Sequence, residues 1–128
     1  MKTFLLVEPN PHVNEMLITT LRRILPKKGW EIMAHHSYAD ASVVLESRTA
    51  DISAALIAHS AKEHGKESLS LIKEIRETCP ASKIVAMNQL PDGDNTCIAA
   101  GANSVLYKGE VRPATLEFAI HNLQINLM

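Results

Sequence analysis

Short apolar runs alternate with amphipathic stretches along the whole chain. Five runs predict strands: Phe4–Val7, Trp30–Ala34, Ala54–Ala58, Ile84–Met87 and Ser104–Tyr107. Runs with consecutive apolar residues are typical of strands that are buried on both faces of a parallel sheet. Between the runs, apolar residues recur three and four positions apart, which is the spacing of one buried helical face.

Helices are expected in five places: residues 11–25, a segment that begins at Ser37 or Asp40, Leu69–Thr78, Thr96–Ala100 and Ala114–Leu123. Asn10 can cap the first helix, Pro11 suits its first turn, and Pro26 ends it. Gly101 occupies the position of a C-cap after the short fourth helix. Two polar stretches that contain glycine, Ser60–Ser68 and Asn88–Asn95, are expected to be loops.

Strand and helix therefore alternate five times, which predicts a single α/β domain over residues 1–128. Five such units in a chain of this length favour a flavodoxin-like three-layer sandwich, with a parallel five-stranded sheet in the order 2-1-3-4-5. In that topology the functional crevice lies at the carboxyl ends of the first and third strands. The segments to inspect are Glu8–Asn10, His59–Ser68, Asn88–Asn95 and Lys108–Gly109.

Composition excludes several function classes. The formal net charge is −1 and the chain has one Trp, two Tyr and two Phe, so neither a basic field nor a base-stacking surface for nucleic acid is expected. The apolar start at Phe4–Val7 is too short for a signal peptide or a membrane span. With only Cys79 and Cys97, reduced thiols in a cytoplasmic protein are expected.

Four passages together resemble the receiver domain of bacterial two-component response regulators, and the resemblance covers essentially the whole chain. The passages are Leu5–Asn10, Leu71–Arg76, Ile84–Asn88 and Ala100–Gly109. The last is the most specific, because it resembles the usual Gly-Ala-Asp-Asp-Tyr-Leu-x-Lys-Pro of the family. The resemblance implies a signalling or binding module and not an enzyme.

The family resemblance also implies a set of site positions. Two adjacent acids after the first strand help to hold magnesium, which prefers oxygen ligands. An aspartate at the end of the third strand accepts the phosphoryl group as a nucleophile. A hydroxyl after the fourth strand and a lysine after the fifth contact the phosphoryl oxygens, and an aromatic residue in the fifth strand transmits the change to the surface.

The acidic pocket and the phosphoacceptor position are degenerate in this sequence. Glu8 fills the first acidic position, but Pro9 fills the second and has no side-chain ligand. The acceptor position falls on Ser60 when counted back from the third helix, and on His59 or Ala58 when aligned on the strand. No register supplies an aspartate, because residues 53–61 contain no acid. Which of the three residues occupies the position stays open.

The switch positions are changed as well. Asn88 replaces the hydroxyl residue with an amide that can still donate a hydrogen bond. Val105 stands where the aromatic residue usually is, although Tyr107 lies two residues on, on the same face of the strand. Lys108 is retained, and Gly109 replaces the usual proline.

The charges that remain predict a closed crevice. Glu8 and Lys108 could pair directly, and Glu8 alone is a weak magnesium candidate, so neither a metal nor a cofactor is expected. The expected function is phosphorylation-independent contact with a sensor kinase, an output domain or a second copy, in a possible homodimer. The family's contact face corresponds to the predicted elements at 96–100, 104–107 and 114–123.

Two other interpretations remain open. In the first, the domain is still phosphorylated, at a residue other than aspartate, either His59 or Ser60. Alternatively, it binds a small molecule at the crevice, as other flavodoxin-like folds do. Pro9 and Pro11 occupy the turn where a glycine-rich phosphate loop would lie, which disfavours the second alternative.

Overall fold

Five parallel strands form one sheet in the order β2-β1-β3-β4-β5, which confirms the predicted flavodoxin-like topology. The computed structural model describes residues 2–47, 52–60, 65–89 and 94–123. The strands are β1 (Lys2–Val7), β2 (Trp30–His35), β3 (Ile52–His59), β4 (Lys83–Asn88) and β5 (Ser104–Tyr107). Each pairs in parallel with its neighbours, so all the carboxyl ends lie at one edge of the sheet.

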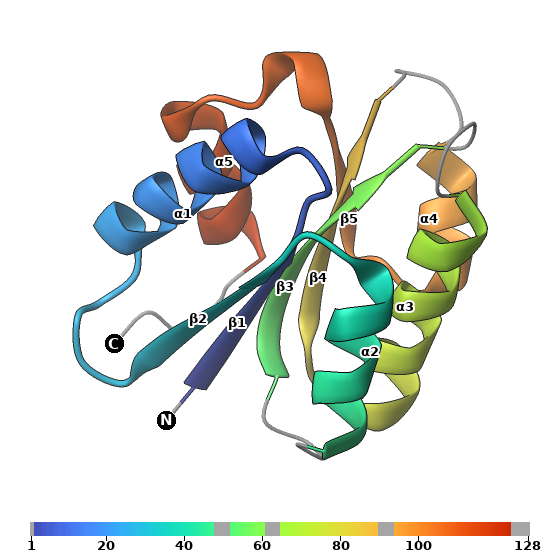
Figure 1. Ribbon diagram of the computed structural model, residues 1–128. Helices are drawn as coiled ribbons and strands as arrows, with labels where there is room; N and C mark the ends of the chain where they lie inside the picture. The colour runs from blue at the N-terminus through green and yellow to red at the C-terminus, as the bar shows by residue number, and fades with distance from the viewer. Residues whose placement is uncertain (1, 48–51, 61–64, 90–93, 124–128) are drawn as a thin grey trace.

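Helices cover both faces of the sheet and complete three layers (Figure 1). On one face lie α1 (Pro11–Ile24) and α5 (Pro113–Asn122), and on the other lie α2 (Tyr38–Ser47), α3 (Gly65–Thr78) and α4 (Asp94–Ala100). A 3₁₀ turn, Lys108–Glu110, follows β5. The short fourth helix predicted from the sequence is present, with seven residues.

Successive residues of the central strands contribute to two separate apolar clusters, one on each face. In β1, Leu5 and Val7 pack toward α2 and α3, whereas Phe4 and Leu6 pack toward α1 and α5. All four side chains are buried. This burial on both sides explains why the strand has no polar position between Phe4 and Val7.

Local hydrogen bonds define several helix ends. Asn10 caps α1, because its Oδ1 accepts from the backbone N–H groups of His12 at 2.9 Å and Val13 at 3.2 Å. Ser37, rather than Asp40, lies directly before the first residue of α2, and its Oγ accepts from the Asp40 N–H at 3.2 Å. Gly101 ends α4 with a φ of 126°, as its predicted C-cap position requires.

Two expected loops are shorter than their composition indicated. The prediction of a loop over Ser60–Ser68 is wrong at its end, because α3 begins at Gly65. The Ser68 hydroxyl donates to the Gly65 carbonyl at 3.2 Å. Polar residues that suggested a loop therefore belong to the first turn of α3. Similarly, α4 begins at Asp94, within the loop expected to run to Asn95. Residues 61–64 and 90–93 lie outside the described residues.

Two further expectations concern membrane-spanning segments and the two cysteines. None of the described helices is long and apolar enough to cross a membrane. Cys79 and Cys97 are both buried, and they form no disulfide with each other.

Candidate functional site

A polar cavity of about 260 Å³ lies at the carboxyl edge of the sheet. Its lining residues come from the ends of β1, β3 and β4, the start of α2 and the turn after β5: Glu8, Pro9, Asn10, Tyr38, Ala58, His59, Ser60, Gln89 and Lys108. The structure therefore brings both halves of the acidic pocket, the three acceptor candidates and the retained lysine together around one crevice.

The centre of the crevice is an ion pair between Glu8 and Lys108. Glu8 follows the last buried residue of β1, and its side chain is only 1% exposed. Its Oε1 contacts the Lys108 Nζ, and its Oε2 accepts from the Asn10 N–H at 3.0 Å. Lys108 reaches this carboxylate from the turn after β5 and keeps 30% of its side chain exposed.

This arrangement does not fit the magnesium ion that the family resemblance would imply. A divalent cation needs several oxygen ligands, and both Glu8 oxygens already have partners. Pro9 offers no side-chain oxygen. Among the described residues, no group of three or more His, Cys, Asp or Glu side chains is placed to hold a metal.

The backbone beneath Glu8 is fixed by a buried amide that the sequence reasoning missed. Asn14, in α1, donates through Nδ2 to the carbonyls of Glu8 at 3.1 Å and His35 at 3.0 Å. The Glu8 N–H donates to the His35 carbonyl at 3.1 Å. Asn14 therefore ties α1 to the ends of β1 and β2. The only sequence signal was a polar residue on the inner side of an amphipathic helix.

His59, the last residue of β3, points toward α3. The ring is buried, and its Nδ1 lies 2.5 Å from the Ser68 Oγ. Ser68 has one hydroxyl proton, which it can donate to the Gly65 carbonyl. The His59 tautomer with its proton on Nδ1 then donates to the Ser68 Oγ, so both contacts of the hydroxyl are hydrogen bonds. Burial lowers the pKa of His59, which favours the neutral ring.

The other two acceptor candidates have different surroundings. The Ala58 side chain belongs to the apolar cluster beneath α1 and α5, and its carbonyl accepts from the Tyr38 hydroxyl at 2.6 Å. Ser60 is half-buried and comes directly after the strand. The structure thus distinguishes the three environments, and which of the three residues corresponds to the family's acceptor position remains a prediction.

Tyr38 is a further lining residue that sequence reasoning did not select. Burial, followed by the negative charges of Glu8 and Glu67, raises the pKa of its hydroxyl well above the usual range. The hydroxyl therefore stays protonated and keeps donating to the Ala58 carbonyl. No sequence pattern signals this contact, which spans 20 residues.

The predicted switch residues lie beside the crevice and not in its lining. Asn88 ends β4 and is buried, with His59 and Tyr107 as its register partners on the neighbouring strands. Val105 packs against the apolar cluster that includes α4, whereas Tyr107 is 37% exposed. Gly109 leaves room for the Tyr107 ring, since a Cβ there would lie 2.9 Å from two ring carbons.

Comparison with solved structures finds the same fold in response regulators. A response regulator from Thermotoga maritima is 22% identical, with a TM-score of 0.74 over 96% of this chain and 97% of that chain. An orphan response regulator of H. pylori is 17% identical, with a TM-score of 0.75 over 95% of each chain.

A third similar structure is an atypical orphan response regulator for which a phosphorylation-independent regulatory mechanism is described. It is 18% identical, with a TM-score of 0.72 over 94% of this chain and 93% of that chain. No family model and no curated protein matches the sequence. At these identities the likeness establishes the receiver-type fold, and function must be argued from the site.

Proposed function

We propose that this chain is a receiver-like module of two-component signalling that acts by protein contact, without phosphorylation of its crevice and without enzymatic turnover. The observation that carries the proposal is the ion pair between Lys108 and the buried Glu8. It occupies the place where receivers use a cation and a lysine to offset a phosphorylated aspartate. The response-regulator fold of the structural neighbours supports the signalling class.

The ion pair opposes phosphoryl transfer for an electrostatic reason. Phosphoryl transfer depends on positive charge that is available to the developing anion. Here the Lys108 ammonium is already engaged by Glu8, and residues 53–61 supply no carboxylate nucleophile. The crevice is thus balanced in charge before any donor arrives.

The proposed contact surface is the face formed by α4, β5 and α5. It exposes three large apolar side chains, at 46% for Ile98, 37% for Tyr107 and 66% for Phe118. One such residue is unremarkable, but apolar side chains on three neighbouring elements are a feature of interaction sites. The partner would be a sensor kinase, an output domain or a second copy of the chain.

Intact mass after incubation with acetyl phosphate and magnesium tests the proposal. We expect no adduct of about 80 Da, whether acid-labile or acid-stable. An established receiver in the same tube is the positive control for the donor. A stoichiometric adduct on this chain would refute the proposal.

The alternative of phosphorylation at a residue other than aspartate has one observation in its favour, because Ser60 lines the crevice together with Lys108. Should an adduct form, a His59→Ala/Ser60→Ala variant decides between this alternative and modification elsewhere. Loss of the adduct would place it at one of these residues. The small-molecule interpretation stays a prediction, to be tested by the thermal shift that a flavin nucleotide would cause.

A further inference from the structure

The outer edge of β2 carries backbone groups that the sheet does not use. β2 is the first strand in the sheet order and pairs with β1 alone. The Gly29 carbonyl accepts from the Lys2 N–H at 2.7 Å, and the His35 carbonyl accepts from the Glu8 N–H at 3.1 Å. Because alternate residues of a strand bond to opposite neighbours, the N–H and C=O groups of residues 30, 32 and 34 point to the outer edge.

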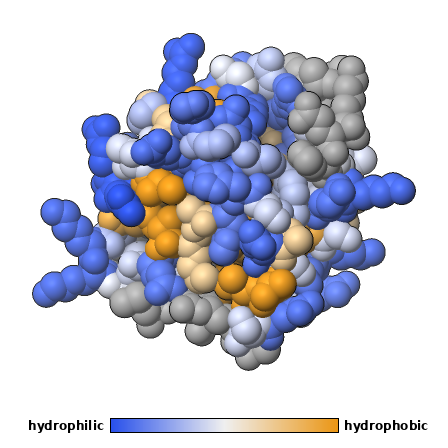
Figure 2. Space-filling model, in the orientation of Figure 1, coloured by the Kyte–Doolittle hydropathy of each residue, from blue (hydrophilic) through white to orange (hydrophobic). Residues whose placement is uncertain are grey.

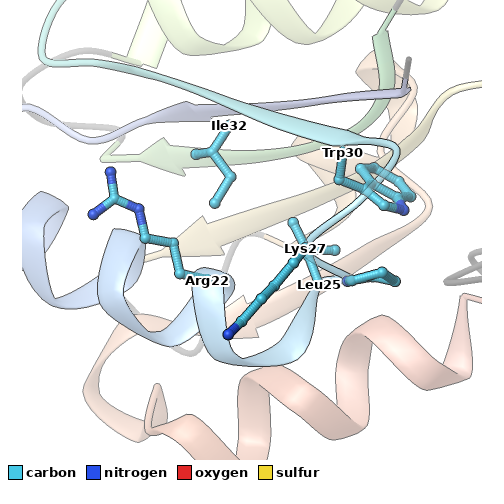
Figure 3. A pocket seen from close by; sticks show the side chains of 6 residues that line it. Arg22, Leu25, Lys27, Trp30 and Ile32 are labelled. Carbon is cyan, nitrogen blue, oxygen red and sulfur yellow. The ribbon is translucent and has the colours of Figure 1, made fainter.

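A groove of about 360 Å³ runs beside this edge, between β2 and the end of α1. Figure 3 shows Trp30 and Ile32 of β2 facing the groove, with Leu25 and Lys27 from the connection after α1. The side chains of residues 30 and 32 thus line the groove, while their backbone groups face outward. In Figure 2, apolar atoms reach the surface in the region of β2, bordered by hydrophilic side chains.

Two cations line the groove. They are Arg22 and Lys27, both exposed, and the described residues that line the groove include no acid. Among the described residues, neither Arg22 nor Lys27 forms an ion pair. Such a surface complements an acidic partner.

From these three observations we infer that β2 is a docking edge for an extended segment of a protein partner that carries both aliphatic and acidic residues at alternate positions, on the side that faces the groove. The segment would add a sixth strand by bonding to the outward groups of Trp30, Ile32 and Ala34. Only every second side chain of that strand points to the groove side of the sheet. On that side, an aliphatic side chain would enter the groove, and an acidic side chain two positions away would contact Arg22 and Lys27. Strand addition of this kind derives affinity from the backbone and specificity from alternate side chains.

The inference is independent of the proposed function of the crevice. The crevice lies at the carboxyl end of the sheet, whereas the groove lies at the start of β2 and the end of α1. Lysine and proline on the strand are two of the common devices that protect an open edge strand. β2, with the sequence Trp-Glu-Ile-Met-Ala-His, has neither, and Glu31 is its only acidic or basic residue apart from the terminal His35.

Titration of the isotope-labelled chain by amide NMR tests the inference, with two blocked hexapeptides as probes. One carries leucine, glutamate and leucine at alternate positions with threonine between them, and the other has lysine in place of the glutamate. We expect the acidic peptide to cause saturable shifts and slower hydrogen exchange at the amides of residues 30, 32 and 34. Exchange at residues 31, 33 and 35, which face β1, should change less. Shifts confined to another surface, or equal binding of the lysine peptide, would overturn the inference.

Two variants separate charge from backbone pairing. Arg22→Glu/Lys27→Glu changes only exposed side chains and should weaken binding of the acidic peptide by about tenfold or more. Ile32→Pro removes one outward N–H without removing a bond to β1, and should reduce binding while the spectrum stays dispersed. Unchanged affinity in the charge-reversed variant would overturn the inference, whatever the fate of the proline variant.

Two further measurements identify competing occupants. If the acidic peptide binds only to a chain shortened after Leu123, the occupant is the chain's own residues 124–128. If exchange at residues 30, 32 and 34 slows with protein concentration alone, the occupant is a second copy. Either outcome would overturn the assignment to an external partner.

Discussion

Lys108 and Glu8 form an ion pair in which the two partners differ in access to water. The Glu8 side chain is 1% exposed, whereas the Lys108 side chain is 30% exposed. A buried charge that loses its partner cannot easily be rehydrated, whereas a half-exposed one can. The free-energy cost of breaking the pair should therefore depend on which residue is removed.

Lys108→Met should lower the free energy of unfolding by about 2–3 kcal/mol, because it leaves the buried Glu8 carboxylate unpaired. Glu8→Gln should cost about 1 kcal/mol, since the lysine can turn toward solvent. The double variant should recover most of the loss of Lys108→Met, because it removes both charges. Urea denaturation monitored by circular dichroism measures all three values. Equal costs for the two single variants would contradict the asymmetry.

The pairing of Glu8 with Lys108 could be predicted because it depends on topology alone. In a parallel sheet, the ends of β1 and β5 lie at the same edge, and Glu8 and Lys108 are the two charged positions of the family's site that this sequence retains. The contacts that hold the crevice could not be predicted in the same way. Asn14, Tyr38 and Ser68 make side-chain bonds to residues 6 to 21 positions away. Such bonds depend on exact helix placement, which no local pattern specifies.

The buried His59 should make stability sensitive to pH. Burial lowers its folded-state pKa below the ordinary value of about 6.5, so the unfolded chain binds more protons between the two values. Stability is therefore fullest above about pH 6.5 and declines as the pH falls from there toward the folded-state pKa. A His59→Asn variant keeps an amide near Ser68 but cannot titrate.

The measurement is the urea midpoint of both chains from pH 7.5 down to pH 5. We expect the wild-type midpoint to fall relative to that of His59→Asn over this range. The other histidines are present in both proteins, so their effect on the urea midpoint cancels when the two midpoints are subtracted. A constant difference would show that His59 does not titrate differently in the folded and unfolded states.

Gly109 and the Tyr107 ring occupy adjoining space. An added Cβ at Gly109 would come within 2.9 Å of the ring, so the ring must move in Gly109→Ala. Because Tyr107 is 37% exposed, the ring can swing outward, and the loss of stability should stay below about 1 kcal/mol. The expected signature is a large change in the Tyr107 ring NMR signals.

Gly65→Ala is the matched control for this substitution, because its Cβ would meet the Ser60 carbonyl at an ordinary 3.5 Å. It should leave the Tyr107 signals unchanged. If Gly109→Ala also leaves them unchanged, the contact between the ring and Gly109 is absent in solution.

The first half of the most specific passage of the family resemblance, residues 100–103, has a structural role away from the crevice. Gly101 ends α4, and its carbonyl accepts from Arg76 at 2.8 Å and 3.1 Å. Asn103 Oδ1 accepts from Arg76 at 2.7 Å and from the Ile84 N–H at 2.8 Å. Gly101 and Asn103 therefore help to hold the fold together. This role explains how the resemblance persists in this passage although residues at the site positions differ from the family pattern.

Arg76 connects α3 to the start of β4 and the turn before β5. It also donates to the carbonyls of Pro80 at 2.7 Å and Ser82 at 2.8 Å, so one guanidinium satisfies four separate acceptors.

Arg76→Ala should lower the free energy of unfolding by about 2–4 kcal/mol, because it leaves part-buried carbonyls without donors. Arg76→Lys should recover less than half, since an ammonium cannot reproduce the planar fork. Arg22→Ala, at an exposed position of α1, is the control and should change stability by less than about 0.5 kcal/mol. Urea denaturation of the three variants decides the matter, and full recovery by lysine would show that charge alone, without the fork geometry, holds this junction.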